Sequence, residues 1–272
     1  MRAIHADRYL FAAGLLLFGA LNIAFGAFNM PWQPIVGIPL QAELARGAGA
    51  LVSACALALF VPRTAAWAAA LATTAFVLLF WSPQVVFLGH LALTRGGLSV
   101  GACLPLSEDT AMLCGAVTLM AMTVRGTALE RAWLAGPGVL TAARAGFGLA
   151  CLVFGASHFV YADFTAQMIP GFVPFHLAFA YITGAGHVLA GLAILSGVMA
   201  RLAATLEAVM MSLFVLLVHV PMLVAGPKPE AMQIDWTMLA AAMTLSGSAW
   251  AMARSLEGRP WFFRAPAVWR SA

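Results

Sequence analysis

The chain has 272 residues, of which 63% are hydrophobic and only 9% are charged, and its formal net charge is +4. Soluble domains carry about a quarter charged residues, so this chain has too few charges to cover a surface that faces water. Its positive charge forms neither a basic stripe nor a nucleic-acid-binding motif, which excludes nucleic acid as a partner. The lipid bilayer is therefore the expected solvent for most of its surface.

A membrane-spanning helix needs about 20 mostly apolar residues, and the sequence predicts eight such helices. Their ranges are 9–28, 41–61, 65–87, 107–124, 139–160, 175–197, 202–222 and 236–253. The first range follows Arg2 and Arg8, as a signal peptide would. It is long enough to span and has a counterpart in mid-chain, so we interpret it as a retained helix. Ser107 and Asp235 precede apolar runs and are predicted N-caps. The fold class is an all-α membrane protein.

The two halves of the chain repeat one another in the same order. The repeated segments are Phe18-Gly19-Ala20 and Phe154-Gly155-Ala156, Gly47-Ala48-Gly49 and Gly184-Ala185-Gly186, and Phe76-Val77-Leu78-Leu79 and Phe214-Val215-Leu216-Leu217, the last pair followed by Pro83 and Pro221. We interpret them as copies of one four-helix unit, with residues 1–135 as the first unit, 136–257 as the second and 258–272 as a cytoplasmic aromatic and basic tail. Each unit has an even number of spans, so both copies point the same way.

The arginines predict the orientation. One side of the predicted topology holds the N-terminus, the even-numbered loops and the C-terminus, and its arginines are Arg2, Arg8, Arg63, Arg125, Arg131, Arg144, Arg201, Arg254, Arg259, Arg264 and Arg270. The other side holds Arg46, Arg95 and Lys228. Positive residues favour the cytoplasmic side. Both termini are therefore predicted to be cytoplasmic and, in a bacterial host, the membrane is the inner membrane.

The opposite face is predicted to carry two stretches rich in proline and aromatic residues, 29–34 and 167–175, which stop the preceding helices near the headgroups. Its loops are also expected to hold acidic residues, namely Glu43, Glu108, Asp109, Asp163, Glu230 and Asp235. None of the four cysteines forms a CxxC pair, and no metal site is predicted. A disulfide between Cys103 and Cys114 on the outer face remains one alternative, because connectivity cannot be read from sequence.

The histidines are the candidate site. Ionisable groups inside a membrane are costly, and each is a functional hypothesis. His158 and His219 fall near the outer ends of the fifth and seventh predicted helices, and His187 lies close to the midplane. At the positions that match His158 and His219, the first unit has Asn22 and Trp81.

Three interpretations of this cluster remain open. The histidines could serve only packing, through hydrogen bonds across helices or to an outer loop, for instance to Asp163. They could meet the oxygens of a quinone and exchange its protons. They could also hold haem b or a metal between helices. Glu207, two turns into the seventh helix, is expected to pair with an arginine such as Arg144 or to reach towards water, with a proton relay as the alternative.

The second unit resembles the DoxX-like family of four-helix membrane proteins. The resemblance lies in Gly155-Ala156-Ser157-His158-Phe159, Met168-Ile169-Pro170-Gly171-Phe172-Val173-Pro174, Ala190-Gly191-Leu192-Ala193-Ile194-Leu195 and Leu217-Val218-His219-Val220-Pro221. The first unit is similar in outline but lacks both histidines. The resemblance implies a four-helix membrane fold and, for the founding members, association with thiosulfate:quinone oxidation. Other relatives support the maturation of periplasmic redox enzymes.

The expected function is that of a quinone-associated or accessory subunit of a respiratory or redox assembly, with one outer-leaflet site that contains His158, His187 and His219. Its expected partners are other membrane or periplasmic redox proteins. The alternatives are a structural subunit or chaperone of a membrane complex, a haem-b-binding subunit and a transporter. Few midspan polar groups are available to line a transport path, which disfavours the last of these.

Overall fold

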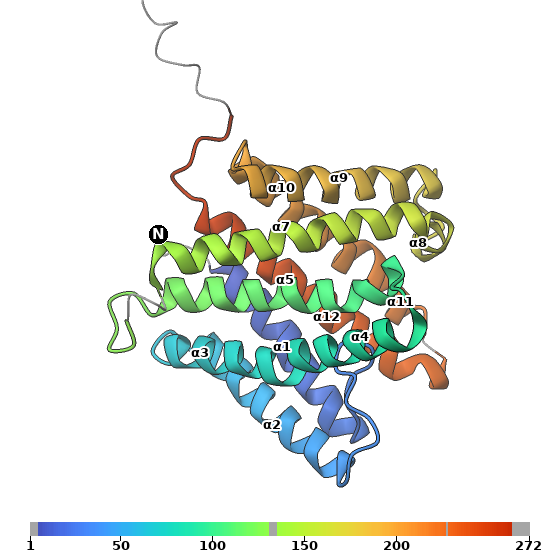
Figure 1. Ribbon diagram of the computed structural model, residues 1–272, viewed down its shortest axis with the longest axis horizontal. Helices are drawn as coiled ribbons and strands as arrows, with labels where there is room; N and C mark the ends of the chain where they lie inside the picture. The colour runs from blue at the N-terminus through green and yellow to red at the C-terminus, as the bar shows by residue number, and fades with distance from the viewer. Residues whose placement is uncertain (1–4, 131–134, 227, 263–272) are drawn as a thin grey trace, which may run out of the picture.

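The computed structural model describes residues 5–130, 135–226 and 228–262, and every regular element in these ranges is a helix (Figure 1). The first half contains α1 (Ala6–Phe25), α2 (Gln41–Phe60), α3 (Ala65–Phe76), the π-helical turn η1 (Val77–Trp81), α4 (Ser82–Arg95) and α5 (Val100–Thr123). The second half contains α7 (Pro137–Val160), α8 (Ala162–Met168), α9 (His176–Ser196), α10 (Ala200–Phe214), the π-helical turn η2 (Val215–His219), α11 (Val220–Val224), η3 (Pro229–Ala231) and α12 (Met232–Ser255).

A helix lies at each of the eight ranges predicted from the sequence. Within the described residues, six continuous helices are long and apolar enough to cross a membrane, so the chain has the helices of a multi-pass membrane protein. They are Ala6–Phe25, Gln41–Phe60, Ala65–Arg95, Pro137–Val160, His176–Ser196 and Ala200–Val224. The other two, α5 and α12, are as long but less apolar. They bury Thr118, Thr244, Ser246 and Ser248, because neighbouring helices rather than lipid surround these side chains.

The helices form a ring that is divided through its centre. Along the ring, α1 packs on α2, α2 on α3, α3 on α5, α5 on α7, α7 on α9, α9 on α10, α10 on α12, and α12 on α1. The two less apolar helices, α5 and α12, also pack on each other and divide the ring into two compartments. The first compartment lies between these two helices and α1, α2 and α3, and the second lies between them and α7, α9 and α10. The last long helix of each half therefore contacts the first helix of the other half.

Glycines allow close contact between the first two helices of each half. A Cβ atom at Gly49 would lie 2.6 Å from the carbonyl oxygen of Gly19, and one at Gly184 would lie 2.8 Å from the Cβ of His158 and 3.3 Å from the carbonyl oxygen of Gly155. Gly49 and Gly184 thus make similar close contacts. Gly47, which was aligned with Gly184 from the sequence, does not make such a contact, since a Cβ there would meet open space.

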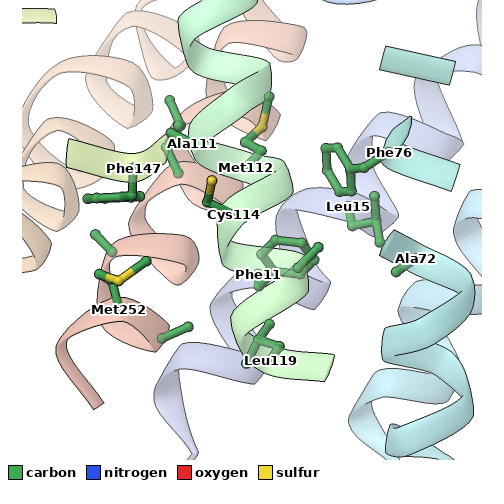
Figure 2. Close-up of a cluster of buried hydrophobic side chains, with 14 of the residues drawn as sticks. Phe11, Leu15, Ala72, Phe76, Ala111, Met112, Cys114, Leu119, Phe147 and Met252 are labelled. Atoms are coloured by element: carbon green, nitrogen blue, oxygen red, sulfur yellow. The ribbon is translucent and has the colours of Figure 1, made fainter. Parts of the chain in front are cut away.

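The hydrophobic core continues across α5 (Figure 2). Phe11 and Leu15 of α1 and Phe76 of α3 lie on one side of α5, while Phe147 of α7 and Met252 of α12 lie on its other side. Cys114 points into this core, and the structure has it and Cys103 as free thiols. The predicted disulfide alternative is wrong because one straight helix separates the two residues by eleven positions, about 16 Å.

The predicted starts of α5 and α12 are also corrected. The hydroxyl of Ser99 accepts a hydrogen bond from the amide of Ala102 (3.1 Å), so Ser99 is the N-cap of α5, and Ser107 lies inside the helix. Glu108 and Asp109 consequently belong to α5 rather than to an outer loop, and Asp109 is fully buried. Similarly, α12 begins at Met232, before Asp235.

Both described chain ends lie at one end of the helices (Figure 1). There Arg254 of α12 pairs with Asp7 of α1 (2.8 Å), and Arg144 of α7 donates to the carbonyl of Ser255 (2.5 Å). Arg201 of α10 stacks over Trp261 of the predicted tail (4.2 Å). We refer to this as the arginine end. Residues 263–272 of the tail, with Arg264 and Arg270, and also Arg2 and Arg131 lie outside the described residues.

Candidate functional site

A cavity of about 430 Å³ lies in the second compartment, towards the end of the molecule opposite to the arginine end. Its walls come from α7, α8, α9, the α10–η2 segment, α12 and the first turns of α5. Ligand pockets have volumes of about 300–1,000 Å³ and are mainly apolar with a few polar groups. This cavity meets that description, because its lining is mostly aliphatic and aromatic. Its ionisable residues are His158, His187, His219, Glu108 and Tyr161.

The π-helical turn η2 brings two lining residues to the cavity. The amide of Val220 donates to the carbonyl of Val215, five residues earlier, so one extra residue is inserted in this turn. Pro221 follows and has no N–H to continue the normal pattern. The last two residues of η2, Val218 and His219, line the cavity. The first half repeats this device at η1, where the amide of Ser82 donates to the carbonyl of Val77 ahead of Pro83.

His158, on α7, is held by α9. Its Nδ1 lies 2.9 Å from the hydroxyl of Thr183 and 3.3 Å from the carbonyl oxygen of Ala180. A carbonyl only accepts hydrogen bonds, so the proton of the neutral ring is on Nδ1. The other ring nitrogen, Nε2, is then an acceptor. Among the described residues, this ring is therefore held by Thr183 and Ala180, and not by Asp163 as predicted.

His187 and Glu207 form a buried pair. Nδ1 of His187 lies 2.8 Å from a carboxylate oxygen of Glu207, and both residues are only 1% exposed. This corrects the prediction that Glu207 pairs with Arg144 or reaches water, because the carboxylate lies inside the protein and Arg144 binds Ser255 instead. A carboxylate that accepts a hydrogen bond from Nδ1 fixes the tautomer and the orientation of an imidazole.

The rings of the cluster are in contact. The rings of His158 and His187 meet edge to face with centroids 5.0 Å apart, and Phe214 lies against both rings at 6.1 and 5.9 Å. His219 lines the same cavity, and its buried Nδ1 has no hydrogen-bond partner among the described residues. All three predicted site residues therefore face one cavity, with direct contact observed between His158 and His187.

Sequence analysis missed several residues of this site. Thr183 lies four residues before His187, on the same face of α9, and that spacing could have identified it. Glu108 lines the cavity from α5 and accepts a 2.7 Å hydrogen bond from the indole of Trp32, which lines it too. No local signal predicts that contact, because the two residues are 76 positions apart.

One comparison, with models of protein families, matches the part of the chain that forms most of the cavity wall. Residues 147–253, from α7 to α12, match the model of a family described as "Domain of unknown function (DUF8561)". No curated protein and no solved structure matches the chain. The match covers the helices that carry His158, His187, Glu207 and His219.

Proposed function

We propose that the chain crosses the membrane eight times, as two DoxX-like four-helix units with both termini in the cytoplasm of a cell with an inner membrane. Contacts at both ends of the molecule support full crossings by α5 and α12. At one end, the amide of Gly101 of α5 bonds to the hydroxyl of Tyr161, and Thr237 of α12 bonds to Asn29. At the arginine end, α5 and α12 finish together, since Thr123 and Arg254 line one pocket. At 24 residues each, both helices are long enough to span.

We further propose that the cavity binds a quinol, and that the chain is an accessory subunit of a redox assembly. The observation that carries this proposal is the pair of imidazoles whose Nδ1 atoms are engaged, His158 by Thr183 and Ala180, and His187 by Glu207. Each ring has Nε2 left as a hydrogen-bond acceptor. A quinol donates through two hydroxyl groups and has an apolar body, which suits the apolar walls around them.

The same arrangement supports proton transfer. Oxidation of a quinol to a quinone releases two protons and two electrons. The free ring nitrogen of a neutral imidazole is a common proton acceptor in proteins. We assign proton acceptance to Nε2 of His158 and His187, with Glu207 stabilising the imidazolium that forms on His187. We propose that the two electrons pass to a haem or iron–sulfur group of a partner redox protein in the membrane or the periplasm.

The geometry disfavours haem b between His158 and His187, which was one of the alternatives left open by the sequence. Axial ligands of a haem iron lie on opposite faces of the macrocycle. The rings of His158 and His187 contact each other edge to face, so no macrocycle fits between them. The structural-subunit and chaperone alternatives predict no saturable small-molecule site, so one binding experiment separates them from the quinol proposal.

That experiment is a titration of the purified protein with decylubiquinol and with decylubiquinone, followed by tryptophan fluorescence. We expect saturable binding, tighter for the quinol, and about a tenfold loss of quinol affinity in His158→Phe and in His187→Phe. The control is His90→Phe, because His90 is an exposed histidine of α4 and should leave affinity within about twofold. Absence of saturable binding of either redox form by the wild-type protein would contradict the proposal.

A further inference from the structure

A second cavity, of about 400 Å³, lies at the arginine end. It is formed where the first turn of α1, the α2–α3 connection and the last turns of α5 and α12 meet. Its charged or titratable lining residues are His5, Arg8, Arg254 and Glu257. Pro62 and Glu257 are exposed, so the cavity reaches the surface. It is separate from the histidine cavity, which lies near the opposite end.

Arg8 is buried in this cavity without a counter-ion. Its side chain belongs to a residue that is 6% exposed, and no carboxylate lies within ion-pair distance of it among the described residues. Its guanidinium donates a 3.3 Å hydrogen bond to the hydroxyl of the neighbouring Tyr9 and lies 5.1 Å from the centre of that ring. Within the described part of the chain, the buried Nε of Arg8 has no hydrogen-bond partner. Buried charges are almost always paired, so this geometry points to an anion.

Arg254 provides a second donor of fixed orientation. One terminal nitrogen forms an ion pair with Asp7 (2.8 Å), and the other donates to Nδ1 of His5 (2.5 Å). Its Nε is buried and has no hydrogen-bond partner in the residues that the structure describes. Because Nδ1 of His5 accepts this bond, the proton of that neutral ring is on Nε2. Asp7 balances the charge of Arg254, so the charge of Arg8 is the unbalanced one in the buried part of the cavity.

We propose that Arg8, Arg254 and His5 bind a phosphate group. Phosphate presents several acceptor oxygens, and guanidinium groups match it with charge-assisted hydrogen bonds. Glu257 is the opposing charge in the lining, and it is exposed to solvent rather than enclosed with Arg8. With the arginine end in the cytoplasm, the cavity lies at the headgroup level of the leaflet that is rich in anionic lipid. The phosphate can thus come from a lipid headgroup or from free phosphate.

The test uses the full-length protein in an uncharged detergent, titrated separately with inorganic phosphate and with dihexanoyl-phosphatidylglycerol while its melting temperature is followed. We expect a saturable rise, with affinity about tenfold weaker in Arg8→Gln. Arg125→Gln is the matched control, because Arg125 is an exposed arginine at the same end outside the cavity. Saturation by inorganic phosphate identifies free phosphate as a sufficient ligand, and saturation by the lipid alone identifies the headgroup.

A second variant covers the case in which Arg8→Gln does not fold. Glu257→Gln removes the exposed opposing charge and should strengthen binding of the same probe about threefold. The proposal is overturned if neither probe gives a saturable shift with the wild-type protein. It is also overturned if Arg125→Gln weakens binding as much as Arg8→Gln does, or if Glu257→Gln leaves the affinity unchanged.

Discussion

At the end of the molecule away from the arginines, the segments that follow α1 and α7 differ in how they meet the helices. The segment after α1 folds inwards, and Phe28, Asn29, Trp32 and Gln33 are all buried. It is held by hydrogen bonds between Asn29 and Asn22 (2.5 Å) and between Asn22 and Gln33 (3.0 Å). The segment after α7 forms α8 and a largely exposed stretch, with Phe172 and Phe175 exposed. The first compartment is therefore closed by its own loop, whereas the second is hollow.

The side chains at matching positions explain the rest of this difference. The fourth residue of η1 is Phe80, which is fully buried between Phe18 and Phe76 at 5.2 and 4.7 Å, and the fourth residue of η2 is Val218, which lines the cavity. His187 follows Gly184 by three residues, and the residue three after Gly49 is Val52, a core side chain. The first half thus has buried aromatic and aliphatic side chains at these positions, whereas the second half has a cavity lined by imidazoles.

The largest expected effect on the free energy of unfolding comes from disrupting the buried pair of His187 and Glu207, which the first half lacks. Glu207→Ala leaves His187 buried without its partner, and we expect the free energy of unfolding to fall by about 3 kcal/mol. Equilibrium unfolding in mixed micelles measures it. The double variant His187→Leu with Glu207→Leu removes both polar groups and should recover most of the loss. Equal instability of the single and double variants would contradict the assignment of the pair.

The second effect on stability tests the close contact between α1 and α2 at Gly49. Gly49→Ala forces a Cβ against the carbonyl of Gly19, and we expect a loss of about 1–3 kcal/mol. Gly47→Ala meets open space and should stabilise the helix by about 0.5 kcal/mol. The same unfolding assay compares them. Equal stability of the two variants would contradict the close contact of Gly49 with Gly19.

The smallest effect concerns the group that holds His158. Thr183→Val removes the hydroxyl beside Nδ1, and a hydrogen bond between membrane helices contributes about 0.6 kcal/mol. We expect that loss in unfolding, with a few-fold weaker quinol binding. Thr205→Val is the matched control, because the Thr205 hydroxyl bonds to the backbone of Arg201 at 2.8 Å in its own helix. Equal quinol affinity in both threonine variants would show that Thr183 does not position the ring.

The lengths of the apolar runs predicted the ends of helices well where the helix surface is expected to face lipid. The sequence placed α9 within one residue at each end, and it predicted α7 from residue 139 to its observed end at residue 160. It failed where protein surrounds the helix. The start of α5 was predicted seven residues too late, because the polar Ser107, Glu108 and Asp109 are tolerated inside the bundle and were interpreted as a boundary.

The sequence singled out three histidines that line the cavity, but not the residues that bond to them. The three histidines stood out because charged or titratable groups are rare in apolar helices. The pairing of His187 with Glu207 was missed, since it depends on the approach of α9 to α10 and neither residue has a local signal for the other. The contribution of Trp32 was missed for the same reason, as it reaches α5 from a loop of the first half.

The central claim is that the cavity of the second compartment binds a quinol. The most direct test fills this cavity with an aromatic side chain like the one found in the first compartment. Val218→Phe gives η2 the residue that η1 has at Phe80 and alters none of the histidines. The account predicts loss of saturable decylubiquinol binding with the unfolding free energy within about 1 kcal/mol of wild type, and wild-type binding for Val209→Phe, whose position on α10 is 40% exposed. Quinol binding by Val218→Phe at wild-type affinity would contradict it.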